Sequence, residues 1–329
     1  MKLRSSFLYT LFVLTALALG AADEPKEKPK AKPPTETFLD PEKAGPDYAD
    51  QGEYSNDWGG AQVIALGEGK FRLVIYQGGF PGAGWDQAIE KTMLEGKREG
   101  DKITFAPNAN GWKHSLANSV LTTTTTGGDE YTMKKIQRAS PTLGDHPPAG
   151  ALVLYDGSNA DAWNNARVDE RKLLAAGATT RQKFTNFALH AEFLLPFKPL
   201  GRGQDRGNSG VYLQDRYEIQ VLDSFGLKGE ADECGAIYSQ VPPKVNMCFP
   251  PLTWQTYDID FEAAQFGADG KKTKNAVTTI KHNGVVIHGH QEIKGPTGGG
   301  QPENASGGGI QLQGHGNPVF YRNIWIVPK

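Results

Sequence analysis

Short segments in which apolar and polar residues alternate recur along the chain, separated by turns rich in glycine and proline. Alternation with a period of two is typical of β-strands with one buried face. In the N-terminal half the clearest examples are 61–66, 71–76 and 102–107. We expect them to form a small antiparallel sandwich or barrel, whereas 86–95 is compatible with a short helix.

The C-terminal half has the clearer strand pattern. The alternating segments there are 187–195, 217–223, 256–261, 277–290, 309–315 and 319–327. Within 277–290, Asn283-Gly284 suits the two-residue turn of a β-hairpin. About seven strands without helices between them predict an all-β fold, a two-sheet antiparallel sandwich or jelly roll.

The chain also divides by composition. Residues 1–22 combine basic residues, an apolar run and small residues, as a secretory signal peptide does, and 23–35 alternate charge with proline as in an extended linker. A turn-rich stretch at 138–150 separates a small β domain at 36–140 from a second domain at 151–329. We expect export to the periplasm or the exterior, without a membrane span after signal cleavage; an uncleaved anchor is the alternative.

Charge and cysteine content limit the partners and the cross-links. The 35 Lys and Arg residues nearly balance 37 Asp and Glu, without a long basic run, so we do not expect nucleic acid as a partner. Cys234 and Cys248 are the only cysteines. In an exported protein they are expected to form a disulfide, and two buried thiols are the alternative.

Two predicted strands place polar groups on the face opposite their apolar residues. Glu218 and Gln220 share that face on one strand, because side chains two apart point the same way. Gln311, Gln313 and His315 share it on another. If both strands belong to one sheet, they form a polar trough suited to a hydroxyl-rich ligand. An ordinary solvated sheet face is the alternative.

Other polar residues offer further candidates. His288 and His290 share one face of the predicted hairpin and could bind a metal, although such a pair is more often a plain polar face. On the last strand Arg322 and Asn323 are expected to point to opposite faces, so only one can enter the trough. Arginine is the better donor to a developing oxyanion.

Tryptophans are prominent in the N-terminal half. Trp58, Trp85 and Trp112 each stand beside Gly or Asn in a predicted loop. They could stack on a sugar ring. We favour the interpretation that they close the ends of a small β core, because tryptophan is highly buried on average.

The C-terminal half carries a series of motifs in a distinctive order. They include KFTNFALHAEFLLP (183–196), GNSGVYLQDRYEIQVLDS (207–224), ECGAIYSQVPP (233–243), WQTYDIDF (254–261), LQGHG (312–316) and YRNIWI (321–326). This series resembles the 3-keto-disaccharide hydrolase family, also described as 3-keto-glucoside lyases and hydratases. The resemblance covers 151–329, not 36–150, and implies a concanavalin A-like jelly roll.

The resemblance implies an enzyme that cleaves glycosides already oxidised at carbon 3. A ketone there acidifies the hydrogen on carbon 2, so one base and one electrophile suffice to expel the oxygen on carbon 1 by β-elimination. The partner would be a 3-keto sugar, and the outcome a lyase or a net hydrolase. The carboxylate pair of ordinary glycosidases is not needed. A non-catalytic, lectin-like protein is the alternative.

We hypothesise the following roles. Either Glu218 or His315 is the general base, and the other is an acid or a ligand of a possible divalent cation. The ketone would be polarised by that cation, Arg322 or Lys183. The further candidates for substrate binding are Gln220, Gln313, Tyr212 and Trp254.

Overall fold

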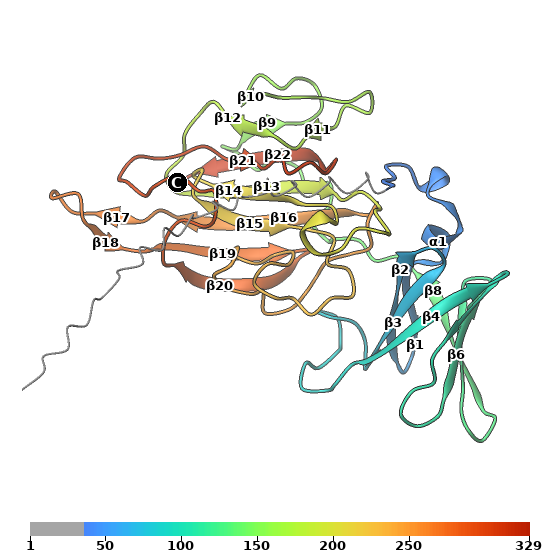
Figure 1. Cartoon of the computed structure of the whole chain (residues 1–329). Helices are drawn as coiled ribbons and strands as arrows, with labels where there is room; N and C mark the ends of the chain where they lie inside the picture. Colours follow the sequence, from blue (N-terminus) through green and yellow to red (C-terminus); the bar gives the residue numbers. More distant parts are fainter. Residues whose placement is uncertain (1–35) are drawn as a thin grey trace, which may run out of the picture. The chain divides into compact units, whose positions relative to one another are not determined.

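The computed structural model describes residues 36–329, so the predicted signal peptide and the linker at 23–35 lie outside the described residues. The described part is nearly all β, as the sequence predicted (Figure 1). Its helical elements are η1 (Pro41–Lys43), α1 (Gly45–Asp50) and η2 (Gly203–Asp205). No helix in 36–329 is long and apolar enough to cross a membrane.

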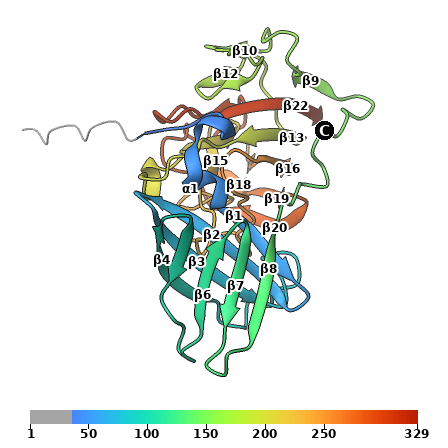
Figure 2. The same ribbon diagram turned by 90° about the vertical axis from the view of Figure 1, so that its right-hand side faces the viewer.

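The first eight strands close into an antiparallel barrel in which each strand pairs with its neighbours in sequence, and β8 pairs with β1 (Figure 2). They are β1 (Gly52–Asn56), β2 (Gly59–Gly67), β3 (Lys70–Gln77), β4 (Thr92–Glu99), β5 (Lys102–Phe105), β6 (Lys113–Ala117), β7 (Val120–Thr124) and β8 (Glu130–Ile136). The helical interpretation of 86–95 is wrong. Its last residues begin β4, whose side chains alternate between half-buried and exposed as a strand requires.

Two antiparallel sheets form a sandwich from the rest of the chain, which confirms the predicted jelly-roll class. The five-stranded sheet has the order β10-β12-β21-β14-β15, and the seven-stranded sheet has the order β11-β22-β13-β16-β19-β20 with β9 beside β22. Their strands are β9 (Leu152–Tyr155), β10 (Trp163–Asn164), β11 (Leu174–Ala175), β12 (Ala178–Thr180), β13 (Phe187–Leu194), β14 (Ser209–Leu213), β15 (Tyr217–Val221), β16 (Trp254–Glu262), β19 (Ala276–His282), β20 (Val285–Ile293), β21 (Gln311–Leu312) and β22 (Phe320–Pro328). A separate two-stranded ribbon joins β17 (Gln265–Phe266) and β18 (Lys272–Lys274).

Alternation explains which residues fill the sandwich. Val211 of β14 and Ile219 of β15 lie in the main core with Tyr257 of β16, each essentially inaccessible to solvent. The predicted hairpin is present between β19 and β20. Its turn residues Asn283 and Gly284 have φ of 49° and 79°, the positive values that a type I′ turn requires.

The predicted disulfide is absent from the structure. Cys234 and Cys248 are both buried and free. The Cys234 thiol lies 3.3 Å from the Tyr257 hydroxyl, and both cysteines belong to the main core. They pack there as small apolar side chains, and a core of this size needs no cross-link to be stable.

Candidate functional site

Adjacent strands of the five-stranded sheet bring Tyr212 and Glu218 together on the side away from the core. The two residues are register partners between β14 and β15. The Tyr212 hydroxyl lies 2.9 Å from Glu218 Oε2 and 2.6 Å from the carbonyl oxygen of Gly298. Both side chains are 2 % exposed, so this carboxyl group is held away from water.

The environment of Glu218 favours its protonated form. Burial raises its pKa to about 7, and the hydrogen bond with Tyr212 only partly opposes that effect. Tyr212 has a single hydroxyl proton, and the Gly298 carbonyl can only accept. When that proton goes to Gly298, a protonated Glu218 can donate to the Tyr212 oxygen. A carboxyl group of this kind exchanges protons near neutral pH, as a general acid or base must.

Glycines surround this carboxyl group. A Cβ atom on Gly210 would lie 2.3 Å from Glu218 Oε1, so only glycine leaves room for the carboxyl group there. On the outer side, Gly298 and Gly299 are exposed, and Gly299 has a φ of 79°. The hydroxyl of Thr297 accepts a hydrogen bond from the backbone N–H of Glu218 at 2.8 Å. The segment 297–299 therefore packs against the backbone of Glu218 and the hydroxyl of Tyr212 without a bulky side chain.

The two predicted amides have different surroundings. Gln313 donates to the Tyr212 hydroxyl at 3.3 Å, and its buried Oε1 has no hydrogen-bond partner within the described part of the chain. Gln220 is occupied by its surroundings: it donates to Gln204 at 3.0 Å and accepts from the backbone N–H of Val221 at 3.0 Å. Gln313 is thus the amide whose Oε1 can still accept a hydrogen bond from a substrate hydroxyl group.

His315 and Lys183 do not join this cluster. His315 is exposed in the turn after β21, and within residues 36–329 it makes no hydrogen bond or ion pair with Glu218. Lys183 is exposed at a separate hollow of about 380 Å³ beside the β14–β15 turn, which Asp215 and Arg216 also line. The predicted grouping of these two residues with Glu218 is not observed.

Arg322 and the substrate-binding candidate Trp254 belong to the other sheet, so the expectation that Arg322 enters the trough beside Glu218 is wrong. Arg322 lies on β22 and donates to Glu192 of β13 at 2.7 Å, and its guanidinium group stacks 3.9 Å above the Trp254 ring. Both face away from the core on the seven-stranded sheet. Packed sheets lie about 10 Å apart, so the core separates Arg322 from Glu218.

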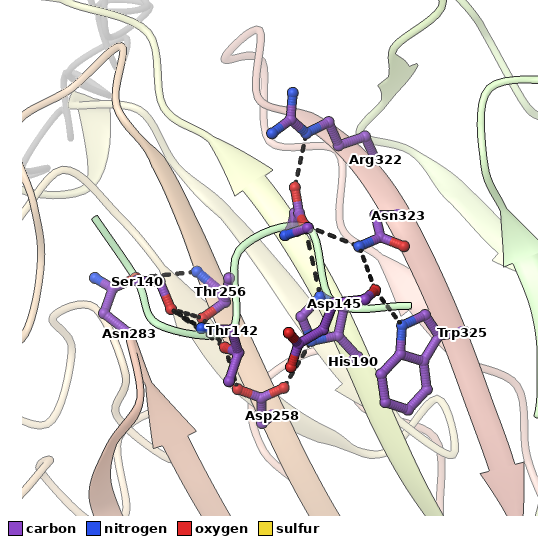
Figure 3. A network of polar contacts seen from close by, with 12 residues as sticks. Ser140, Thr142, Asp145, His190, Thr256, Asp258, Asn283, Arg322, Asn323 and Trp325 are labelled. Atoms are coloured by element: carbon purple, nitrogen blue, oxygen red, sulfur yellow. Dashed lines mark hydrogen bonds and ion pairs between the residues drawn. The ribbon is translucent and has the colours of Figure 1, made fainter. Parts of the chain in front are cut away.

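The outer face of that sheet holds a second polar cluster, which the sequence analysis missed (Figure 3). The His190 imidazole is fully buried, with Nδ1 2.6 Å from Asp258 and Nε2 3.7 Å from Glu192. Its ring stacks on Trp325 with the centroids 5.0 Å apart. Burial alone would lower the pKa of His190, but the two carboxylates outweigh burial and raise it to about 9.

The pKa of Glu192 is lowered, in contrast to that of His190. Burial raises the pKa of this carboxyl group, but the ion pair with His190 and the hydrogen bonds from Asn323, Arg322 and the Gly144 N–H prevail and lower it to about 2. At neutral pH the cluster is thus an imidazolium between carboxylates. With the Arg322 guanidinium counted, its two positive and two negative charges balance, and His190 and Glu192 have no proton to exchange near pH 7.

The segment between the barrel and the sandwich covers this cluster (Figure 3). Gly144 donates its backbone N–H to Glu192 at 2.6 Å, and Thr142 donates its hydroxyl to Asp258 at 2.7 Å. Asn323 and Trp325 both donate to the carbonyl oxygen of Asp145. We conclude that the His190 cluster fixes residues 140–145 to the sheet.

A β-bulge explains why Arg322 and Asn323 do not point to opposite faces, contrary to prediction. The register between β13 and β22 shifts between His190 and Glu192, and Asn323 has a φ of 43°. An extra residue in one strand interrupts the alternation. Both side chains consequently reach Glu192, at 2.7 and 2.9 Å.

The histidines of the hairpin are also separated. His288 is buried and bonds the carbonyl oxygen of Gly235 at 2.8 Å, whereas His290 is exposed with a φ of 47°. The irregular register of β19 with β20 sets them apart. Among the described residues no three His, Cys, Asp or Glu side chains are grouped to hold a metal ion. We therefore assign no step to a metal at Glu218.

Comparison with known proteins identifies the C-terminal part. Residues 150–327 match the family described as the 3-keto-alpha-glucoside-1,2-lyase-like domain. A candidate glycosyl hydrolase from Parabacteroides distasonis ATCC 8503, solved at 2.13 Å resolution, is 34 % identical over 55 % of this chain and 85 % of its own, with a TM-score of 0.51. No match was found among curated proteins.

Two further candidate glycosyl hydrolases from the same organism are more distant. They are 15 % and 21 % identical, with TM-scores of 0.41 and 0.40. They cover 55 % and 54 % of this chain, and 94 % and 99 % of their own length.

Proposed function

Because the chain belongs to the family of 3-keto-alpha-glucoside-1,2-lyase-like domains, we propose that it is an enzyme that cleaves 3-keto-glycosides by removing the proton on carbon 2. The observation that carries this proposal is the buried Glu218 carboxyl group, whose pKa is raised to about 7 beside Tyr212. A base with such a pKa is partly ionised at neutral pH and still takes up a proton readily.

The reaction would run through Glu218 and the groups around it. The carboxylate takes the proton from carbon 2, the electron pair of that C–H bond forms the double bond between carbons 1 and 2, and the glycosidic oxygen leaves carbon 1 with its bonding pair. The protonated Glu218 can then return the proton to the departing oxygen. Gln313, whose Oε1 is unpartnered among the described residues, would hold a sugar hydroxyl.

Substrate must first reach this carboxyl group. Gly298 and Gly299 lie against the Tyr212 hydroxyl, which bonds this carboxyl group, and the hydrogen bond from Tyr212 to Gly298 fastens them. We propose that this glycine segment moves aside when substrate binds, because glycines adopt new backbone angles at little steric cost. Breaking the bond to Gly298 would also free the Tyr212 hydroxyl to donate to the substrate or to Glu218.

We further propose that the protein acts after export. The support is the pattern of residues 1–22, with Lys2 and Arg4 before an apolar run. N-terminal sequencing of the mature protein from the cell envelope or medium tests this. Recovery of the chain in the cytosol with Met1 and Lys2 intact would contradict export.

The test of function is turnover of a 3-keto-glucoside compared with its unoxidised parent. We expect release of the aglycone from the keto form alone, because only the ketone acidifies carbon 2. Glu218→Gln should lower kcat at least about 100-fold, within the range that general bases contribute. Glu303→Gln is the matched control, since Glu303 also pairs with a tyrosine, Tyr217 at 2.7 Å, outside the cluster.

Each outcome has a separate meaning. Full activity of Glu218→Gln would remove Glu218 as the base. Equal cleavage of the parent glycoside would remove the elimination mechanism. Binding of the keto form without any product would favour the lectin-like alternative.

A further inference from the structure

One end of the barrel is hollow, although its other end is filled. The middle and far end are packed by buried residues, among them Phe71, Leu73 and Leu116. Figure 2 shows the end of the barrel where β1 turns into β2 and β7 into β8. A cavity of about 290 Å³ lies at that end. Small-molecule sites begin near this size, and the mouth of a β-barrel is a common place for them.

Alternation places the lining residues inside the barrel. Ile75 lies two residues after the core residue Leu73, and Leu121 and Met133 complete an apolar wall. At the rim, Trp58 and Tyr131 are 53 % and 56 % exposed. Trp58 therefore does not close the core, contrary to the interpretation favoured from the sequence.

A single polar group is buried in this wall. His114 is 2 % exposed, and its Nδ1 lies 2.9 Å from the hydroxyl of its register partner Thr123. Its Nε2 is buried and has no hydrogen-bond partner within residues 36–329. Burial lowers the pKa of His114, so the ring is neutral at pH 7. A buried nitrogen without a partner is costly unless a ligand or water meets it.

The two asparagines that line the cavity accept hydrogen bonds from the backbone. Asn56 accepts from the backbone of Trp58 and Gly59 and donates to Thr132, which fixes the β1–β2 turn. Asn108 accepts from the backbone N–H of Trp112 in the same way. None of the described residues lining the cavity is Asp, Glu, Lys or Arg.

The apolar wall, the unpartnered His114 nitrogen and the lack of charged side chains among the described lining residues limit which ligands fit the cavity. A charged ligand would lose its hydration without gaining a counter-charge. A sugar would bring several hydroxyl groups against a buried wall in which His114 Nε2 is the one buried atom without a partner among the described lining residues, and each unmet hydroxyl group weakens binding. An aromatic ring with one hydroxyl group matches both the apolar wall and the lone imidazole nitrogen.

We propose that the mouth of the barrel binds a small uncharged aromatic alcohol, of which phenol is the simplest, with its hydroxyl group on His114 Nε2 and its ring against the apolar wall and the rim aromatics. The ring would gain contact with Trp58 and Tyr131, since aromatic pairs attract beyond the area they bury. This site is independent of Glu218 and of the proposed reaction.

Calorimetric titration of the full chain at pH 7 with phenol, toluene and glucose tests the proposal. We expect phenol to bind with one site per chain, and toluene about tenfold more weakly because it lacks the hydroxyl group. Glucose should not compete. No phenol binding, equal affinities for phenol and toluene, or displacement of phenol by glucose would overturn the proposal.

Two variants locate the site. In His114→Leu the preference for phenol over toluene should disappear while toluene binding persists; an unchanged preference would overturn the role of His114. Trp58→Ala, at a half-exposed position, should lower the affinity for both phenol and toluene about three- to tenfold. This variant tests the site if His114→Leu does not fold. Met93→Ala is the matched control, because Met93 is 57 % exposed beside the lining residue Thr92 but does not line the cavity.

Discussion

Replacing Glu218 by glutamine should stabilise the protein at neutral and alkaline pH while it removes activity. In the folded chain the pKa of Glu218 is about 7, against an ordinary value of 4.5. The folded protein therefore holds this proton where the unfolded chain has lost it. Between pH 4.5 and 7 the folded state binds more protons, so the free energy of unfolding falls as pH rises.

The size of this effect follows from the shift. A pKa displacement from 4.5 to about 7 lowers the free energy of unfolding by about 3 kcal/mol. The whole of this loss is present above pH 7, and none of it is present below pH 4.5. Glutamine keeps the shape and can donate from its amide to the Tyr212 oxygen, but it carries no charge. The gain of the variant over the wild type should therefore be near zero at pH 4 and reach about 3 kcal/mol at pH 8.

Urea unfolding of both proteins at a series of pH values measures this difference. His190 and every other titrating group contribute equally to the two curves, so their difference isolates Glu218. A constant offset from pH 4 to 8 would show that the carboxyl group is hydrated in the folded protein. Its role as a base with a raised pKa would then be refuted.

Three further predictions concern other parts of the sandwich. Gly210→Ala places a methyl group 2.3 Å from Glu218 Oε1, so turnover of a 3-keto-glucoside should fall about 100-fold while circular dichroism is unchanged; full turnover would mean that the carboxyl position is not critical. His190→Leu removes the cation between Glu192 and Asp258, leaving Glu192 with Arg322 and Asp258 with the Thr142 hydroxyl, and should cost about 3–5 kcal/mol in urea unfolding at pH 7. That loss should shrink as pH rises through about 9, where the wild-type imidazolium loses its proton, and a loss independent of pH would contradict the ion-pair account. Cys234 and Cys248 should both react with a thiol reagent in urea without reductant, whereas a cross-linked pair would not react.

The sequence pattern predicted the sandwich because alternation reports which side of a strand is apolar. In β15, Tyr217, Ile219 and Val221 alternate with Glu218 and Gln220, and the structure places the first set in the core. The same rule correctly assigned Glu218 to the outer face. The hairpin was equally predictable, since its turn depends on two adjacent residues.

Alternation gave no information about which sheet a strand joins or what covers it. Arg322 was assigned to the Glu218 trough, although the two residues lie on different sheets, because sheet order depends on contacts between distant segments. The bulge at Asn323 depends on a φ of 43° that no local motif signals. His190 and Glu192 alternate within β13 as in any solvated strand, so their burial was not predictable.

The covering segments decide what the polar residues on the sandwich can do. Glu218 and Glu192 are both glutamates on outer faces, and both are 2 % exposed or less. Among the described residues no cation pairs with Glu218, so desolvation dominates and its pKa rises. Glu192 receives His190, Arg322 and a backbone N–H donor from residues 140–145, and its pKa falls. Proton transfer at neutral pH is consequently available at the first glutamate and not at the second, which is why we place the chemistry on the five-stranded sheet.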